Sequence, residues 1–184
     1  MTDQERLKSA IENGEYVVFF GGAGVSTASG IPDFRGANGI FTAGKRFSAE
    51  QIVSSGFFYA HPKEFYDFYK SKMLYPNALP NRAHLKLAEL ESRGKVKAII
   101  TQNIDGLHQK AGSKNVIEMH GSALRNYCPR CGKSFDLNYI VKSEGVPRCD
   151  KCGEIIKPDV VLYGEQLDET VLERAWEEVE KCDV

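Results

Sequence analysis

Apolar and polar residues follow two different periods along this chain. Short, largely apolar stretches of about five residues occur between longer segments in which apolar residues recur every three or four positions, the period of a helix. The expected strands are residues 16–20, 96–100, 115–119 and 160–164. The expected helices are residues 3–13, 81–94 and 168–181, with another helix beginning at Pro62. Strands that alternate with helices predict an α/β fold with a parallel sheet, and the unbroken apolarity of residues 16–20 predicts a central strand covered on both faces.

Local signals support these boundaries. Thr2 and Glu5 have the spacing of a capping box, in which each residue bonds the backbone of the other. Pro62 suits the first turn of a helix, while Asn81 and Gly94 suit an N-cap and a helix stop. The last predicted helix carries apolar residues on one side, which we expect to face the core: Val171, Leu172, Ala175, Trp176 and Val179.

Composition narrows the class of protein. With 184 residues, of which 42% are apolar and 27% charged, the chain is globular rather than disordered. A formal net charge of -1 gives no general attraction to nucleic acid or to an anionic membrane. No apolar run approaches the length of a membrane span, and residues 1–14 lack the apolar core of a signal peptide, so we expect a cytoplasmic protein.

A glycine-rich loop, GGAGVSTASGIPDFRG, follows the first predicted strand at residues 21–36. Gly22 and Gly24 stand where a dinucleotide-binding turn needs them, but Thr27 replaces the third glycine of that fingerprint. The polar and aromatic residues of the loop are suited to binding phosphate and ribose or to excluding water: Ser26, Thr27, Ser29, Asp33, Phe34 and Arg35. A tight structural turn with a surface ion pair explains the same residues, and both interpretations stay open on this stretch alone.

Four of the five cysteines form two Cys-x-x-Cys pairs separated by 17 residues. The first pair is Cys128 and Cys131, the second is Cys149 and Cys152, and a glycine follows each pair. This is the spacing of a tetrahedral zinc site. In a reducing compartment, cysteines with this spacing are expected to bind metal rather than to form disulfides. Four thiolates leave no open coordination position, so the predicted zinc is structural and the chemistry lies elsewhere. Cys182 is expected to take no part.

Zinc ribbons also occur in nucleic-acid-binding and protein-binding modules, which gives a second hypothesis from a different class. Between Arg125 and Lys157 the chain has seven basic and four acidic residues. Phosphate binding normally needs a denser basic patch, so we expect no nucleic-acid partner.

Four stretches taken together resemble a known family. They read GAGVSTASGIPDFRG at 22–36, TQNIDGLHQKAG at 101–112, EMHG at 118–121 and, after the zinc cysteines, KPDVVLYGE at 157–165. In this order they closely resemble the bacterial sirtuins, NAD-dependent protein-lysine deacetylases, over nearly all of the chain. The resemblance implies an enzyme that transfers the acetyl group of acetyl-lysine to ADP-ribose and releases nicotinamide and O-acetyl-ADP-ribose.

The resemblance also implies a domain organisation: a Rossmann-like parallel sheet with an inserted four-cysteine zinc-ribbon module and a helical segment. Residues 1–37, 94–122 and 158–184 would form the NAD-binding domain, 38–93 the cofactor loop and helical segment, and 123–157 the zinc module. Sirtuins continue past the point where this chain stops, into a strand and a Gly-Thr/Ser-Ser loop that helps to hold NAD. We therefore expect an incomplete Rossmann-like domain, with weak NAD binding and little activity from these residues alone.

Functional residues follow from the same resemblance. The NAD site would comprise the glycine loop and the segment after the second strand, namely Gly22, Ala23, Gly24, Ser26, Asp33, Phe34, Arg35, Gln102, Asn103, Ile104 and Asp105. The acetylated peptide or protein would pair as an added strand with Val160, Val161, Leu162, Tyr163 and Gly164.

His120 would be the general base in this resemblance, and its position supports that role. It follows the predicted strand at 115–119 and therefore lies at the carboxyl edge of the sheet, where the sites of α/β proteins gather. Histidine titrates near neutral pH, as deprotonation of a ribose hydroxyl requires. The other three histidines, His61, His84 and His108, lie on or beside predicted helices, where we expect structural or surface roles.

Overall fold

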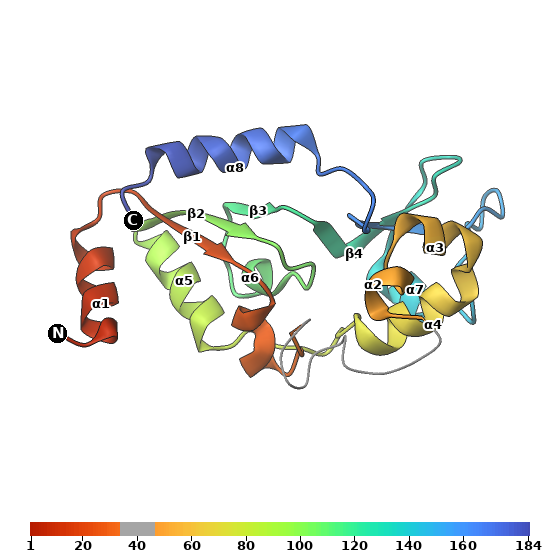
Figure 1. Cartoon of the computed structure of the whole chain (residues 1–184), viewed down its shortest axis with the longest axis horizontal. Coiled ribbons are helices and arrows are strands. Elements are labelled where there is room, and N and C mark those ends of the chain that lie inside the picture. Colours follow the sequence, from red (N-terminus) through yellow and green to blue (C-terminus); the bar gives the residue numbers. More distant parts are fainter. Residues whose placement is uncertain (34–46) are drawn as a thin grey trace.

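The structure, a computed structural model, describes residues 1–33 and 47–184 (Figure 1). Its described strands form two sheets of three strands each. The first sheet contains β1 (Val17–Gly21), β2 (Val96–Thr101) and β3 (Val116–Glu118), and the second contains β4 (Gly121–Tyr127), β5 (Ser134–Asp136) and β6 (Lys157–Val160). The helices are α1 (Asp3–Asn13), η1 (Ala23–Ser29), α2 (Ala49–Ile52), α3 (Ser55–Ala60), α4 (Pro62–Lys72), α5 (Arg82–Ser92), α6 (Leu107–Lys110), α7 (Leu137–Lys142) and α8 (Glu169–Lys181). The predicted α/β fold with a parallel sheet is confirmed.

The first sheet is parallel in the order β1-β2-β3, and helices cover both of its faces (Figure 1). Successive side chains of a strand point to opposite faces. Accordingly, Ile99 of β2 packs with Leu87 and Leu90 of α5, whereas the next residue, Ile100, packs with Ala175 of α8. The successive apolar residues of β2, from Ala98 to Ile100, are explained by this burial on both sides.

The second lobe consists of the antiparallel sheet β5-β4-β6 and a group of short helices. Pro62 begins α4 at its first turn, and the aromatic residues of that helix fill the core of this lobe. Phe65, Tyr66 and Tyr69 are almost completely buried there, together with Phe58 of α3. Aromatic side chains of this size supply much of the apolar area that a small lobe needs to bury.

A short turn at residues 119–120 leads from β3 in the first sheet to β4 in the second. β4 begins at Gly121, whose φ of +74° is in the region that favours glycine. A Cβ atom at this position would lie 2.1 Å from the carbonyl oxygen of Asp159. Beside the turn, Arg125 donates to Glu118 at 2.7 Å and to Asp159 at 2.8 Å, which ties β4 to β3 and β6. The missing Cβ at Gly121 therefore allows β4 to lie close to β6 within the second sheet, directly after His120.

Two expectations about the parallel sheet are wrong. The first strand is not central among the described strands, since β1 lies at the end of the order, and the side chain of Phe20 is 60% exposed. Backbone hydrogen bonds instead place the end of the chain beside β1, with Val18 N–H donating to the carbonyl of Val184 at 2.9 Å. Trp176 of α8 does not face the core but is 62% exposed, because this helix rests on the short sheet through a narrow stripe around Ala175.

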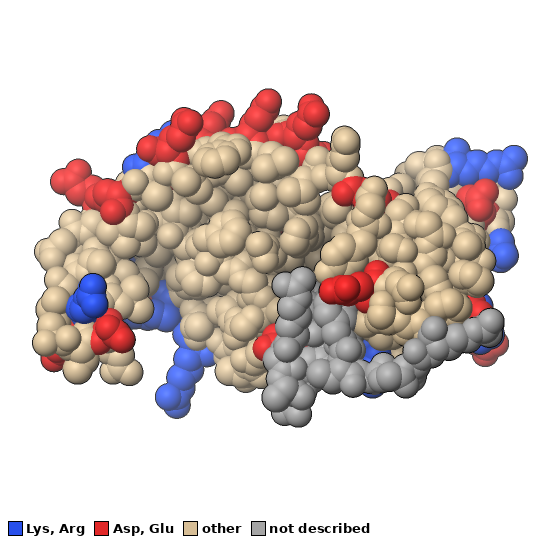
Figure 2. All heavy atoms as spheres, in the orientation of Figure 1, with Lys and Arg blue, Asp and Glu red and all other residues tan. Residues whose placement is uncertain are grey.

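The remaining exposed side of α8 is acidic. In Figure 2 a row of Asp and Glu side chains runs along the helix, at the top of the view. Such a face is suited to solvent and gives no attraction to the phosphates of nucleic acid.

Candidate active site

Three loops meet where the parallel strands end. β1 is followed by η1, β2 by residues 102–106, and β3 by the turn that carries His120. Because β1, β2 and β3 run in the same direction, these loops emerge at one edge of the sheet. They line one side of a cavity of about 630 Å³, and residues 160–165 and 167 line the other. This volume lies within the range of about 300–1,000 Å³ that is typical of small-molecule sites.

Most residues predicted for the site lie together in the wall of this cavity. Those that line it are Ala23, Ser26, Asp33, Gln102, Asn103, Ile104, Asp105, His120, Val160, Val161, Leu162, Tyr163 and Gly164. Gly22 and Gly24 are not among the lining residues, although Gly22 precedes the first turn of η1. Phe34 and Arg35 lie outside the described residues. The sequence therefore predicted residues that the fold brings together from four separate segments.

Ser26 is the centre of a buried hydrogen-bond network rather than an exposed donor. Its hydroxyl donates to Asp105 at 2.7 Å and accepts from the amide of Asn103 at 3.0 Å. The ring of His84 lies 3.5 Å away, and its Nδ1 accepts from the N–H of Asn81, so the proton of the neutral ring is on Nε2, facing Ser26. This network fixes the orientation of Asp105 and Asn103 at the cavity wall.

The other two hydroxyls of the loop are also bonded within the protein. Thr27 donates to the carbonyl of Gly24 at 2.9 Å, and the hydroxyl of Ser29 accepts from the amide of Asn81 at 3.0 Å. These hydroxyls, like that of Ser26, therefore hold η1 in place. Side-chain donation to a phosphate, which the sequence suggested, is not required to explain them.

His120 is oriented by one hydrogen bond. Its Nδ1 lies 3.0 Å from the carbonyl oxygen of Gln102, and a carbonyl only accepts, so Nδ1 carries the proton of the neutral ring. The other nitrogen, Nε2, is then left with its lone pair and can accept a proton. Because His120 also lines the cavity, this arrangement suits a base that acts on a bound molecule.

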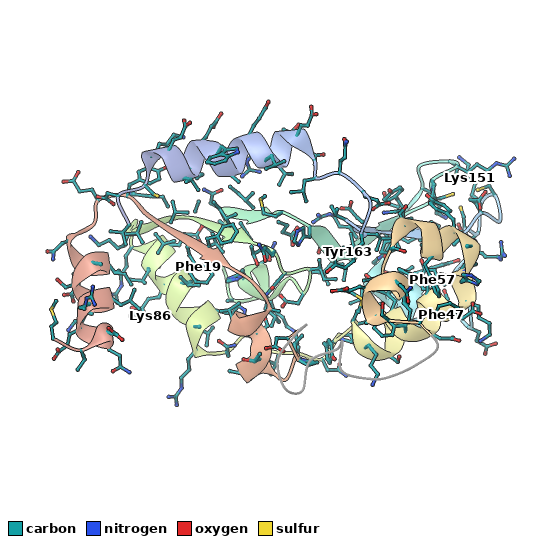
Figure 3. The ribbon with its side chains drawn as sticks, in the orientation of Figure 1. Phe19, Phe47, Phe57, Lys86, Lys151 and Tyr163 are labelled. Atoms are coloured by element: carbon teal, nitrogen blue, oxygen red, sulfur yellow. The ribbon has the colours of Figure 1, made fainter. Side chains whose placement is uncertain are left out.

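An extended segment after β6 forms the opposite wall. Val161 N–H donates to the carbonyl of His120 at 3.0 Å, which links this wall directly to the histidine. Tyr163 exchanges backbone hydrogen bonds with Val53 and Ser55, at 3.1 and 3.0 Å. Figure 3 shows Tyr163 at the boundary between the two lobes, and its side chain is half exposed.

The cysteine pairs form a candidate metal centre in the second lobe. Their ligand atoms all lie within 4.8 Å of one another, although the pairs are far apart in sequence. Each pair begins a similar turn, closed by Gly132 N–H to Cys128 and by Gly153 N–H to Cys149, with φ of +71° and +76° at the two glycines. Four sulfur ligands in such a group fit a tetrahedral zinc ion with a complete ligand shell.

His84 and His108 are the residues that sequence reasoning underestimated. Both are fully buried, and their rings lie 4.7 Å apart in an edge-to-face arrangement behind the cavity wall. Neither ring nitrogen of His108 has a hydrogen-bond partner within the described part of the chain. Burial, together with the nearby His84, lowers the pKa of His108 to about 4. Helical placement alone carried no signal of this burial, which depends on β1 and α6 packing against α5.

Apolar residues of the cavity were also missed. They come from segments with no motif in common: Ile31, Pro32, Val53, Met73, Tyr75 and Leu167. No pattern in the sequence links these positions, since only the folded chain brings them to one wall.

These features define a class of protein: a two-lobed α/β protein with a cleft at the strand ends and a four-cysteine module in the second lobe. Comparison with protein families matches residues 22–184 to the Sir2 family. The chain therefore belongs to the Sir2 family, and the resemblance inferred from the sequence is confirmed.

Individual relatives agree with this assignment. An NAD-dependent protein deacetylase of Clostridium perfringens (strain 13 / Type A) is 58% identical over 180 residues, covering 97% of this chain and 74% of that protein. An NAD-dependent protein deacetylase of Cutibacterium acnes (strain DSM 16379 / KPA171202) is 49% identical over 182 residues, covering 98% and 74%. The solved structure of Sir2 with a p53 peptide and NAD+ is 41% identical, with a TM-score of 0.85, and matches 99% of this chain and 73% of that one.

A second solved structure, Sir2Tm bound to a propionylated peptide, is 39% identical with a TM-score of 0.84, over 98% of this chain and 73% of that one.

Within residues 1–33 and 47–184, no helix has both the length and the apolar character needed to cross a membrane.

Replacing one cysteine of the metal centre tests its structural role. We expect about one zinc per chain in protein purified without chelators, and Cys149→Ser should lose it. Thermal unfolding should then shift down by roughly 10 °C or more, because metal binding contributes to folding. Elemental analysis and calorimetry measure both effects. Cys182→Ser is the matched control, since Cys182 lies outside the cluster, and zinc loss in that control would contradict the assignment.

Burial of His108 predicts a specific pH dependence of stability. Its folded pKa of about 4 lies below the ordinary value of 6.5, so the unfolded chain binds a proton first as the pH falls. The contribution of His108 is complete above pH 6.5 and is lost as the pH falls towards 4. Between about pH 7 and pH 5 the wild-type free energy of unfolding should drop by about 2 kcal/mol more than that of His108→Phe. Urea unfolding at both pH values measures this, and equal drops would contradict it.

Proposed function

We propose that this protein is an NAD-dependent protein-lysine deacetylase, a transferase that moves the acetyl group of acetyl-lysine to ADP-ribose. The observation that carries the proposal is the position of His120. Its Nε2 is left free to accept a proton, and the residue lines a cavity between the strand ends and an extended segment. The named activity of the Clostridium perfringens relative supports the same reaction.

The residues at the strand ends suit NAD as the cofactor. Backbone at Ala23 can approach a pyrophosphate closely, because residues 22–24 have no bulky side chain. Asp105 and Asn103 are held in fixed orientations by Ser26, and carboxylate and amide groups suit ribose hydroxyls and a carboxamide. Bound NAD would supply a ribose carbon that loses nicotinamide and accepts the acetyl oxygen. Phe34 and Arg35 remain proposed cofactor contacts on the strength of the family pattern.

The tasks of the chain in this reaction are orientation and proton transfer. Gln102 holds the His120 ring through its carbonyl, so that Nε2 can take a proton from a hydroxyl placed in the cavity. Ile104 and Leu162 are apolar residues of the cavity wall, where they exclude water from the reacting groups.

The extended segment Val160–Gly164 is proposed to receive the substrate. An acetylated peptide would add as a strand along it, and its acetyl-lysine would reach into the cavity towards His120. Support comes from the solved relatives, of which one holds a p53 peptide and another a propionylated peptide. Acetylated proteins are therefore the proposed partners.

The zinc centre has a structural part in this proposal, since Cys128, Cys131, Cys149 and Cys152 would complete the metal shell and leave no site for a reacting group. The proposed domain organisation divides the chain into an NAD-binding domain, a helical segment and a zinc module. The cytoplasm is the proposed location, because cysteine pairs that bind zinc rather than form disulfides suit a reducing compartment.

A nucleic-acid-binding module fits the structure less well. Arg125 and Lys133 form ion pairs with acidic residues, and Lys157 is buried. These three of the seven basic residues are therefore not available as phosphate contacts.

Deacetylation by the protein is the direct test. We expect nicotinamide release from NAD that depends on an acetyl-lysine peptide, measured by chromatography of the products. His120→Asn should lower kcat for deacetylation by about 100-fold or more, because a general base contributes roughly 10²–10⁴-fold. His61→Asn is the control, since His61 is exposed and outside the cavity. Peptide-dependent activity that survives in His120→Asn would refute the assigned base.

The charges at the cavity predict which acyl groups are accepted. The described residues that line it include Asp33, Asp105 and Glu165 but no Lys or Arg. A succinyl-lysine carboxylate would lose hydration there without gaining a cationic partner among these described residues. We therefore expect kcat/KM for an acetyl-lysine peptide to exceed that for the matching succinyl-lysine peptide by at least about 100-fold. Competition between the two peptides, followed by mass spectrometry, measures the ratio, and a preference for succinyl-lysine would contradict the prediction.

A further inference from the structure

Lys157 is a buried cation that the proposed reaction does not use. The residue is only 6% exposed, although it is the first residue of β6 and stands beside the cavity wall. Its Nζ donates to the carbonyl of Val160 at 3.1 Å and, at 3.4 Å, to that of Pro158. It also forms an ion pair with Glu165 at 3.0 Å, and the Tyr127 ring centre lies 5.9 Å away. Burial of an ammonium group is costly, so a lysine in this position is expected to have a specific task.

Glu165 completes a closed loop around this lysine. The same carboxylate oxygen that meets Lys157 also accepts the backbone N–H of Leu162, at 2.9 Å. The backbone N–H of Glu165 in turn donates to the carbonyl of Leu162, at 2.9 Å. Both backbone groups of Leu162 are therefore bonded to Glu165.

This pair acts where the sheet no longer holds the chain. β6 ends at Val160, and the following residues lie outside the strand ladder. Tyr163 forms an isolated bridge with Ser54, and Gly164, with a φ of +89°, lies in a turn. Their shape depends on a few contacts: those of Val161 and Tyr163 with the neighbouring backbone, and those made by Lys157 and Glu165. Charge-assisted hydrogen bonds of this kind are stronger than neutral ones and keep backbone groups in one direction.

We propose that Lys157 and Glu165 are positioning residues, which hold Val160–Gly164 in the conformation that accepts the acetylated peptide. This inference rests on the proposed function. The lysine fixes the direction of the Val160 carbonyl, and the glutamate fixes both backbone groups of Leu162. The carbonyl of Val161, which lies between them, is thereby held in one direction for pairing with a peptide strand. Neither side chain takes part in proton transfer.

The pair also balances charge at the cavity. Glu165 lines the cavity, and its side chain is 24% exposed. Without the lysine, a partly buried carboxylate would stand uncompensated beside the site of the neutral acetyl group. Removing one partner of such a pair leaves the other charge buried without compensation, whereas removing both leaves no unpaired charge. The single removal is therefore far more disruptive.

Three variants of the full protein test the proposal. Lys157→Met removes the cation but keeps a side chain of similar length, Glu165→Gln removes the charge but keeps an acceptor for Leu162 N–H, and the double variant removes both charges. Lys63→Met is the matched control, because Lys63 forms an exposed ion pair with Asp67 on α4. Zinc content and thermal unfolding verify that each variant is folded.

We expect the variants to change KM for the acetyl-lysine peptide but not KM for NAD. Lys157→Met should raise KM for the acetyl-lysine peptide about tenfold or more, while KM for NAD changes less than about twofold. Glu165→Gln should have a smaller effect, and the double variant should recover part of the loss seen in Lys157→Met, as expected for two coupled residues. Lys63→Met should match the wild type.

Hydrogen exchange provides a readout that needs no activity. Leu162 N–H should exchange faster in Lys157→Met, while the amides of β2 keep their protection. Unchanged exchange at Leu162, an unchanged peptide KM, or a loss confined to KM for NAD would each overturn the positioning role. If the wild-type protein deacetylates no peptide, the proposed function fails, and the exchange result alone then decides whether the pair holds this segment.

Discussion

Parallel pairing of β1, β2 and β3 is the constraint on which the rest of this structure depends. The register places Gly21 beside Thr101, and Thr101 beside Glu118, so the three strands end at nearly the same level. Each of the following loops must then leave the sheet at the same edge, and the residues in those loops become neighbours despite their wide separation in sequence. A cleft with polar groups from three segments is a direct result of this alignment.

The turn between β3 and β4 leads from this edge into the second lobe. At Gly121, directly after this turn, a Cβ atom would collide with the carbonyl of Asp159 in β6, and Arg125 bonds acidic residues in both sheets. His120 stands immediately before this glycine, so the candidate base belongs to the connection between the lobes. Its carbonyl accepts from Val161, which means that one residue contacts the cavity with its ring and the opposite wall with its backbone.

Polar groups buried around the cavity fix the orientation of the residues that line it. Ser26 orients Asp105 on one side, and Lys157 orients the extended segment on the other. Satisfied networks of this kind are costly to bury but hold side chains in single orientations, as a binding site requires. The unpartnered nitrogens of His108 behind this wall are an exception among the described residues, and their burial keeps that ring neutral by lowering its pKa to about 4.

The sequence by itself determined the features that depend on close neighbours or on fixed spacings. The capping box of Thr2 and Glu5, the helix start at Pro62 and the cysteine spacing were all readable, because the interacting groups lie within a few residues or repeat a known pattern. Only the tertiary structure decided which apolar or polar side chains are covered. Trp176 follows a helical apolar pattern and is exposed, whereas Lys157 belongs to a polar residue type and is buried. Burial is set by what distant segments place against a residue, and that contact has no local signature in the chain.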